Sequence, residues 1–99
     1  MINILGVKYD IRETQLDYDT LGRCNRYSKV IELNKDLADI CECKESIDVI
    51  KAQVLRHEIL HAAFHECGLS KYAEDESLVE LLAIQFPKII QAMKEGEAL

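Results

Sequence analysis

The sequence predicts an α+β fold, in which a small antiparallel β-sheet is followed by two helices that pack together. Three observations support this prediction. Short segments of alternating apolar and polar residues occupy the first third of the chain. Between Cys43 and Gly68 there is no Pro or Gly, and apolar residues recur there at helical spacing. A second stripe of apolar residues at helical spacing follows Gly68.

The first strand is predicted at residues 7–12. Apolar and charged residues alternate there, with Val7, Tyr9 and Ile11 on one face, as in a strand that buries one side. Residues 13–20 are polar and acidic, and we expect them to form a loop.

Two further strands are predicted at residues 21–25 and 29–34, on either side of a turn at residues 26–28. In the second of them Ile31 and Leu33 should point inward. Together the three strands are expected to form the antiparallel sheet.

The two helices are predicted at residues 46–66 and 74–94. Ser46 suits the N-cap of the first helix, and Gly68 suits the left-handed residue that follows its last turn. Pro87 lies inside the second helix and should kink it or divide it. The second helix carries an apolar stripe that is expected to be core: Leu78, Leu82, Phe86, Ile89 and Met93.

Length and charge limit the function classes. With 99 residues, 48% of them apolar, the chain is long enough for one modest core, so we expect one domain spanning residues 1–99. A formal net charge of −6 without a basic stripe argues against a nucleic-acid partner. No apolar run approaches a membrane span, and the first residues lack a signal-peptide pattern. We therefore expect a cytoplasmic protein with no membrane partner.

The pattern H-E-x-x-H in the first helix is the clearest chemical signal. His57 and His61 are four residues apart, so they share one helix face and both imidazoles can reach one ion. Glu58 lies about 100° around the axis, beside such an ion, where a general base could take a proton from water. Two histidines satisfied by hydrogen bonds in a core are the alternative explanation.

A catalytic zinc site needs three protein ligands, so a third must come from elsewhere. Cys67 is close in sequence, whereas His65 lies one turn along the same face, about 6 Å from His61. The acidic residues 74–76 and Glu80 come after the turn at Gly68. Helix geometry favours Glu76, at the margin of the apolar face, over Glu80, which should face water. A second helix folding straight back would instead bring Glu80 nearer.

The four cysteines are expected to be free thiols, because the chain is predicted to be cytoplasmic. A second metal site at Cys41-Glu42-Cys43 is less favoured, since its spacing differs from that of a zinc knuckle. The other two are Cys24 and Cys67.

The chain resembles gluzincin-type metallopeptidases of the ImmA/IrrE kind, especially the short versions found in phages and prophages. These share H-E-x-x-H, a turn, and then E-x-x-V-x-x-L-A. The residues that carry the resemblance here are His57, Glu58, His61, Gly68 and Glu76-Ser77-Leu78-Val79-Glu80-Leu81-Leu82-Ala83.

This resemblance implies a minimal zincin-like fold that binds zinc through His57, His61 and Glu76. It implies that Glu58 activates water for hydrolysis of a peptide bond, and that the edge strand of the sheet holds an extended peptide. The substrate would be a protein partner, for example a repressor-type regulator.

Two questions stay open at this point. An oxyanion donor is expected, and Tyr72 and His65 are the candidates. The alternative function is a zinc-stabilised regulator that binds a protein without cutting it, although an intact Glu58 favours the enzyme.

Overall fold

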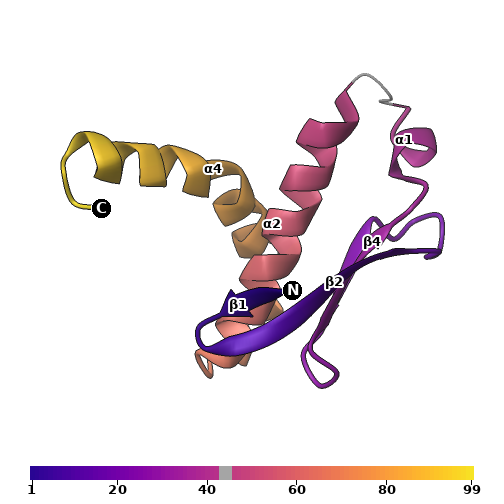
Figure 1. Cartoon of the computed structure of the whole chain (residues 1–99), viewed down its shortest axis with the longest axis horizontal. Coiled ribbons are helices and arrows are strands. Elements are labelled where there is room, and N and C mark those ends of the chain that lie inside the picture. Colours follow the sequence, from indigo (N-terminus) through magenta and orange to yellow (C-terminus); the bar gives the residue numbers. More distant parts are fainter. Residues whose placement is uncertain (43–45) are drawn as a thin grey trace.

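The computed structural model of the protein describes residues 1–42 and 46–99. This part of the chain contains a sheet of β1 (Ile2–Ile4), β2 (Val7–Thr14), β3 (Gly22–Asn25) and β4 (Val30–Asn34), followed by helices α1 (Leu37–Ile40), α2 (Ile47–Glu66), α3 (Ser70–Ala73) and α4 (Glu76–Glu95) (Figure 1). The predicted α+β class is confirmed. Among the described residues, no helix is long and apolar enough to cross a membrane.

The sheet is mixed, so the prediction of an antiparallel sheet is wrong in one pairing. Its strand order is β1-β2-β4-β3, and β2 pairs with β4 in parallel. β3 and β4 form the expected antiparallel hairpin. After β2, the connection at residues 15–21 leads to β3 at the edge of the sheet. The chain then returns as β4, which lies between β2 and β3. Both pairings have the same apolar alternation, so the sequence pattern cannot distinguish them.

β1 is a strand that the sequence analysis does not predict. It forms a hairpin with β2 around Leu5 and Gly6, whose φ angles are 52° and 89°. These angles are typical of a type I′ turn, which usually contains Asn-Gly or Gly-Gly. Leucine is rare at positive φ, so the usual turn signal is missing. The side chain of Asn3 stabilises the turn by accepting a hydrogen bond from Gly6 N–H at 2.7 Å.

α2 packs across the sheet, and the core lies between them (Figure 1). Tyr9, Ile31 and Ala62 are fully buried there, as expected for the inward faces of the two predicted strands. At the C-terminal end of α2, Glu66 accepts hydrogen bonds from the Tyr9 hydroxyl at 2.9 Å and from Lys29 Nζ at 2.6 Å. Apolar burial and a charge-assisted polar contact therefore both hold α2 on the sheet.

The loop at residues 15–21 is organised by Asn34, a buried polar residue at the end of β4. Its side-chain amide donates hydrogen bonds to the carbonyl oxygens of Asp17 and Thr20, at 3.2 and 2.9 Å. Its Oδ1 accepts the backbone N–H of Asp36 at 3.0 Å. Because a buried amide is costly unless it is paired, these bonds fix the path of the loop.

Gly68 ends α2 and turns the chain toward α4. Its φ is 76°, and the N–H groups of Gly68 and Leu69 donate to the carbonyl oxygens of His65 and Phe64, at 3.0 and 2.8 Å. This is the Schellman arrangement, which favours glycine at the left-handed position. The short helix α3 follows, where the sequence suggests only a connection.

α4 continues through Pro87 as one helix, so the predicted division into two helices is absent. A proline has no N–H for the carbonyl four residues earlier, which here belongs to Ala83. Arg56 of α2 supplies the missing donor, since its Nε lies 2.8 Å from Ala83 O. Ala83 and Val79 are fully buried where α4 packs on α2. Because the two helices are this close, the guanidinium of Arg56 on α2 reaches the carbonyl of Ala83 on α4.

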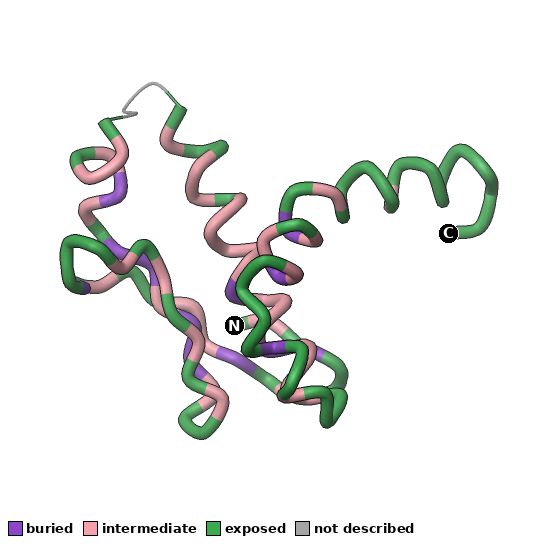
Figure 2. The backbone as a smooth tube through the Cα atoms, turned by 180° about the vertical axis from the view of Figure 1, so that it is seen from behind, coloured by how far each residue is buried: buried purple, intermediate pink, exposed green. Residues whose placement is uncertain are grey.

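The C-terminal half of α4 projects away from the rest of the chain and is exposed along most of its length (Figures 1 and 2). Phe86, Ile89 and Met93 are 37%, 40% and 40% exposed, so the prediction that they belong to the core is wrong. The two long helices cross instead of lying side by side, and α2 covers only the first turns of α4.

The role of Arg56 predicts a coupling with Pro87. Arg56→Ala leaves the carbonyl of Ala83 without a donor, and we expect it to lower the free energy of unfolding by about 1–3 kcal/mol. In a Pro87→Ala background the restored N–H can bond that carbonyl, so the same Arg56 substitution should cost clearly less. Urea unfolding of the four proteins measures both costs, and equal costs in the two backgrounds would contradict this role.

Candidate metal centre

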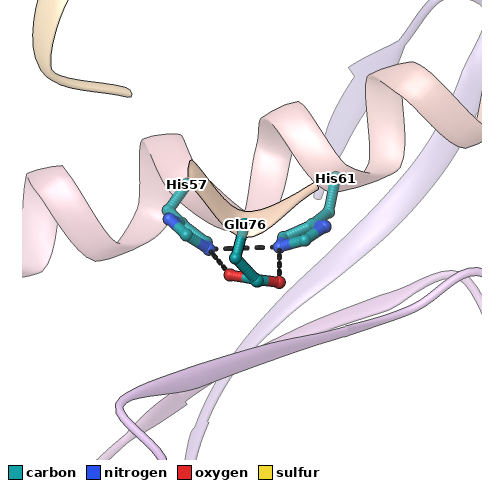
Figure 3. A group of neighbouring side chains, drawn as sticks. All are labelled: His57, His61 and Glu76. Atoms are coloured by element: carbon teal, nitrogen blue, oxygen red, sulfur yellow. Dashed lines mark hydrogen bonds and ion pairs between the residues drawn. The ribbon is translucent and has the colours of Figure 1, made fainter. Parts of the chain in front are cut away.

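Helix α2 presents His57 and His61 on one face, toward the first turn of α4 (Figure 3). The Nε2 atoms of the two rings are 3.1 Å apart, and the ring centroids are 4.8 Å apart. Such a separation follows directly from a spacing of four residues on a helix. Two nitrogen donors thus converge on one point.

Glu76 brings a carboxylate to the same point (Figure 3). Its Oε2 is 2.9 Å from His57 Nε2, and its Oε1 is 3.0 Å from His61 Nε2. Glu76 is the first residue of α4, which begins here because the side chain of Asp75 accepts the N–H of Leu78 at 3.0 Å. This N-cap places Glu76 in the turn that faces α2.

His57, His61 and Glu76 form a group that could hold a metal ion, with one ligand atom from each, all within 4.8 Å of one another. A tetrahedral zinc ion bound at about 2.0–2.1 Å separates its ligand atoms by about 3.4 Å. The contacts of 2.9–3.1 Å are close to that spacing. The Glu76 side chain is 69% exposed, which leaves the group open on one side. The donor set and the spacing therefore fit zinc.

Glu80 does not simply face water, as helix geometry led us to expect: its side chain is 45% exposed, but the carboxylate also contacts α2. Its Oε2 is 2.7 Å from His57 Nδ1, and its Oε1 accepts the side-chain amide of Gln53 at 2.9 Å. The hydrogen bond from Gln53 and the contact with His57 lower the pKa of Glu80. Glu80 therefore contacts the ring nitrogen that points away from the group, whereas Glu76 contacts the one inside it.

Glu58 is buried between α2 and the edge strand β3. Burial raises its pKa to about 7, and the nearby Glu76 acts in the same direction. Gly22 of β3 makes this burial possible. A Cβ at this glycine would lie 2.8 Å from Val54 Cγ1 and 3.2 Å from Glu58 Cγ, both closer than atoms normally approach.

A groove of about 570 Å³ runs along the site. Its walls are the loop at residues 19–21, the edge strand β3, and the faces of α2 and α4 that carry the two histidines and Glu76. Glu58, Glu80 and His65 also line it. The predicted ligands His57, His61 and Glu76 and the predicted base Glu58 therefore border one cavity.

The two candidate oxyanion donors lie in different places. His65 lines the groove, and its Nδ1 is 3.0 Å from Arg26 Nη1 and 3.1 Å from Ser70 Oγ. Arginine can only donate, so Nδ1 accepts and the ring proton lies on Nε2. Burial and the Arg26 charge lower the pKa of His65, which favours this neutral form. Tyr72 is about half exposed and lies beside Phe64, away from the residues that line the groove.

The described cysteines are Cys24, Cys41 and Cys67, and they form no disulfide with one another. Cys67, one alternative for the third ligand, is exposed at the C-cap of α2 and lies outside the group. Burial raises the pKa of the Cys24 thiol to about 11. Cys43, and with it the alternative metal site at the Cys-Glu-Cys sequence, falls outside the described residues.

Sequence reasoning missed the supporting residues Gln53, Arg26 and Gly22. The spacing of Glu76 and Glu80 could have indicated that both contact α2, since residues four apart on one helix face the same neighbour. An isolated glycine in a strand offered another, because it often marks a close approach of another group. Arg26 and His65 are 39 residues apart in the sequence, so no local sequence pattern predicts their contact.

No protein-family model, curated protein or solved structure matches the chain. What this site does must therefore be inferred from its own geometry and chemistry.

Gly22→Ala tests the close packing around Glu58. The added methyl group must push β3 from α2 or displace Val54, and we expect a loss of about 1–3 kcal/mol in the free energy of unfolding. Val54→Ala in the same chain removes the closest clash and should recover part of that loss. Denaturant unfolding of the single and double variants measures the free energy of unfolding of each. If the loss in the double variant equals the sum of the losses in Gly22→Ala and Val54→Ala, the proposed close contact between positions 22 and 54 is contradicted.

Proposed function

We propose that this protein is a zinc-dependent metallopeptidase that hydrolyses a peptide bond in a protein partner. The observation that carries the proposal is the convergence of two imidazole nitrogens and one carboxylate on one point, beside a buried glutamate in a groove. This combination supplies three protein ligands, an open side and a base, which are the parts that metal-assisted hydrolysis requires.

His57, His61 and Glu76 would hold the zinc ion. When bound, zinc supplies Lewis acidity, which polarises a peptide carbonyl and makes a neighbouring water more acidic. The three residues come from two helices whose crossing is tied by Arg56 and by the buried Ala83. Ligands on rigid, mutually packed helices favour a pre-formed site.

Glu58 is proposed as the general base. Its carboxylate would accept a proton from the attacking water and then deliver it to the nitrogen of the leaving amine. Position supports this role, because Glu58 lies next to His57 in sequence, is not in the ligand group and lines the same groove. Its burial against Gly22 keeps the carboxylate from drifting into solvent.

The edge strand β3 is proposed to bind the substrate in extended form. Among the described residues, β3 pairs with a strand on one side only, where β4 lies, and Gly22, Arg23 and Cys24 line the groove. Free backbone groups of an edge strand can pair with an added peptide strand, independently of the peptide's side chains. A peptide held in this way would run along the groove between β3 and the two histidines. The substrate class is thus a polypeptide with an accessible extended segment.

His65 is proposed to stabilise the negative charge that develops on the carbonyl oxygen. Arg26 and Ser70 engage its Nδ1, so Nε2–H is the remaining donor of a ring that lines the groove. A fixed, neutral donor of this kind is suited to an oxyanion.

The enzyme and the alternative, a zinc-stabilised regulator that does not cut its partner, differ in what Glu58→Gln changes. In the enzyme, this variant should keep about one zinc per chain, like the wild type, while cleavage falls by at least roughly 10²-fold. His57→Ala and His61→Ala should lose the zinc. Metal analysis gives the zinc content, and mass spectrometry of β-casein digests, an unstructured test polypeptide, gives cleavage. Equal cleavage by wild type and Glu58→Gln would point to a contaminant and reject the enzyme.

The proposed role of His65 predicts a graded response. His65→Leu removes the donor and should lower kcat by roughly 10²-fold or more with little change in KM. His65→Gln can place an amide N–H near the position of Nε2 and should recover part of the rate. Zinc content serves as the control, because His65 lies outside the ligand group and neither variant should change it. Full activity in His65→Leu would exclude the role.

A further inference from the structure

We infer that Glu80 is a positioning residue, which fixes His57 in the tautomer that binds a metal ion through Nε2, and that Gln53 orients Glu80 for this task. The inference rests on the metal site of the proposed function, but not on peptide hydrolysis.

The two nitrogens of His57 have different partners. Nε2 points into the group, 3.1 Å from His61 Nε2 and 2.9 Å from Glu76 Oε2. Nδ1 points the other way and lies 2.7 Å from Glu80 Oε2. A metal ion at Nε2 needs the lone pair of that atom, so the ring proton must then be on Nδ1. A carboxylate at Nδ1 accepts that proton and disfavours the opposite tautomer.

Both carboxylate oxygens of Glu80 are engaged. Oε2 contacts His57, and Oε1 accepts a hydrogen bond from Gln53 Nε2 at 2.9 Å. Gln53 and His57 are four residues apart on α2, so one helix face holds both partners of the same carboxylate. Two bonds from one helix orient Glu80 more firmly than a single surface contact would. This orientation also keeps Glu80 on the outer side of the ring, which separates it from the ligand Glu76.

An ordinary surface ion pair is the competing explanation. The Glu80 side chain is 45% exposed, and such pairs contribute little to stability. The His57 side chain, however, is only 16% exposed, so the contact fixes a largely buried ring. An ion pair of the ordinary kind would have no effect on which nitrogen of His57 binds a metal ion.

The second histidine has a different support. His61 hydrogen-bonds the backbone of Ala73, a buried residue of α3. A backbone carbonyl fixes a tautomer without adding charge, whereas the carboxylate of Glu80 also makes the His57 ring a stronger donor to a cation. The two ligands should therefore differ, with His57 the one whose affinity depends on a removable charge.

Zinc affinity of the intact protein, measured by competition with a fluorescent chelator, tests the inference. Glu80→Ala should weaken zinc binding roughly 10–100-fold, and Glu76→Ala should weaken it more, because it removes a ligand. Glu80→Gln should lie between the wild type and Glu80→Ala, because its amide oxygen can accept the Nδ1 proton without a charge. Gln53→Ala should cause a smaller loss in the same direction.

Glu74→Ala is the matched control. Glu74 is an exposed carboxylate at the C-cap of α3, close in sequence but absent from the groove lining, so its removal changes the net charge equally. Its zinc affinity should stay close to that of the wild type. Circular dichroism of the zinc-free proteins checks the fold, and Glu80→Gln, which keeps the side-chain shape, replaces Glu80→Ala if the latter does not fold.

Nuclear magnetic resonance of the zinc-loaded protein gives a readout that a merely structural role would not change. The proton on His57 Nδ1 should give a protected signal at low field in the wild type, which shifts to higher field in Glu80→Gln and is lost in Glu80→Ala. Zinc affinity within about twofold of the wild type in Glu80→Ala would overturn the inference. So would a loss equal to that of Glu76→Ala with the Nδ1 signal unchanged, which would make Glu80 a ligand.

The inference and the peptidase proposal can fail separately. If the wild type binds zinc and the Glu80 variants behave as expected but no polypeptide is cut, the positioning role stands and the peptidase proposal falls. If Glu76→Ala leaves zinc affinity unchanged, the assigned metal site is wrong and the positioning role falls with it.

Discussion

The candidate site depends on the crossing of α2 and α4. Two of its donors come from the middle of α2, and the third comes from the first residue of α4, so a small change in the crossing would separate them. Three local features hold it: the left-handed turn at Gly68, the close packing of Ala83, and the hydrogen bond from Arg56 to the Ala83 carbonyl. The last of these exists because a proline leaves that carbonyl without its helical partner.

The same crossing explains why only half of α4 is covered. Helices that cross at an angle are in contact over only a few turns. In α4 these are the turns that carry the buried residues Val79 and Ala83. Beyond it, Phe86, Ile89 and Met93 continue the same apolar face but are exposed to solvent. The geometry that places Glu76 against the histidines is therefore also the geometry that leaves this face uncovered.

Much of the fold can be read from the sequence, because it depends on local periodicity. The strand at Tyr9, the strand at Ile31 and the turn at Gly68 each follow from patterns a few residues long. The parallel pairing of β2 with β4 does not, since it depends on where a seven-residue connection leads. The extent of α4 that is buried depends on an interhelical angle, which no periodic pattern reports.

The site shows the same division between local and distant information. Helical spacing brings His57 and His61 together, and the group that could hold a metal ion contains Glu76 and not Glu80. The contact of Glu80 with Nδ1 of His57 was not predicted, because helix geometry placed Glu80 toward water and its partner lies 23 residues earlier in the sequence. Arg26 and Asn34 form long-range polar contacts near the site, with His65 and with the carbonyl oxygen of Thr20. The spacing of residues in the sequence does not predict these contacts either.

We propose above all that one zinc ion binds between α2 and α4 through His57, His61 and Glu76. A crystal of the zinc-loaded protein, with anomalous diffraction data collected on either side of the zinc absorption edge, tests this claim most directly. We expect one strong anomalous peak within about 2.0–2.2 Å of His57 Nε2, His61 Nε2 and a Glu76 oxygen. We also expect Glu80 to stay in contact with His57 Nδ1. A peak bound instead by Cys24, Cys67 or Glu80, or no ordered peak between the two helices, would contradict it.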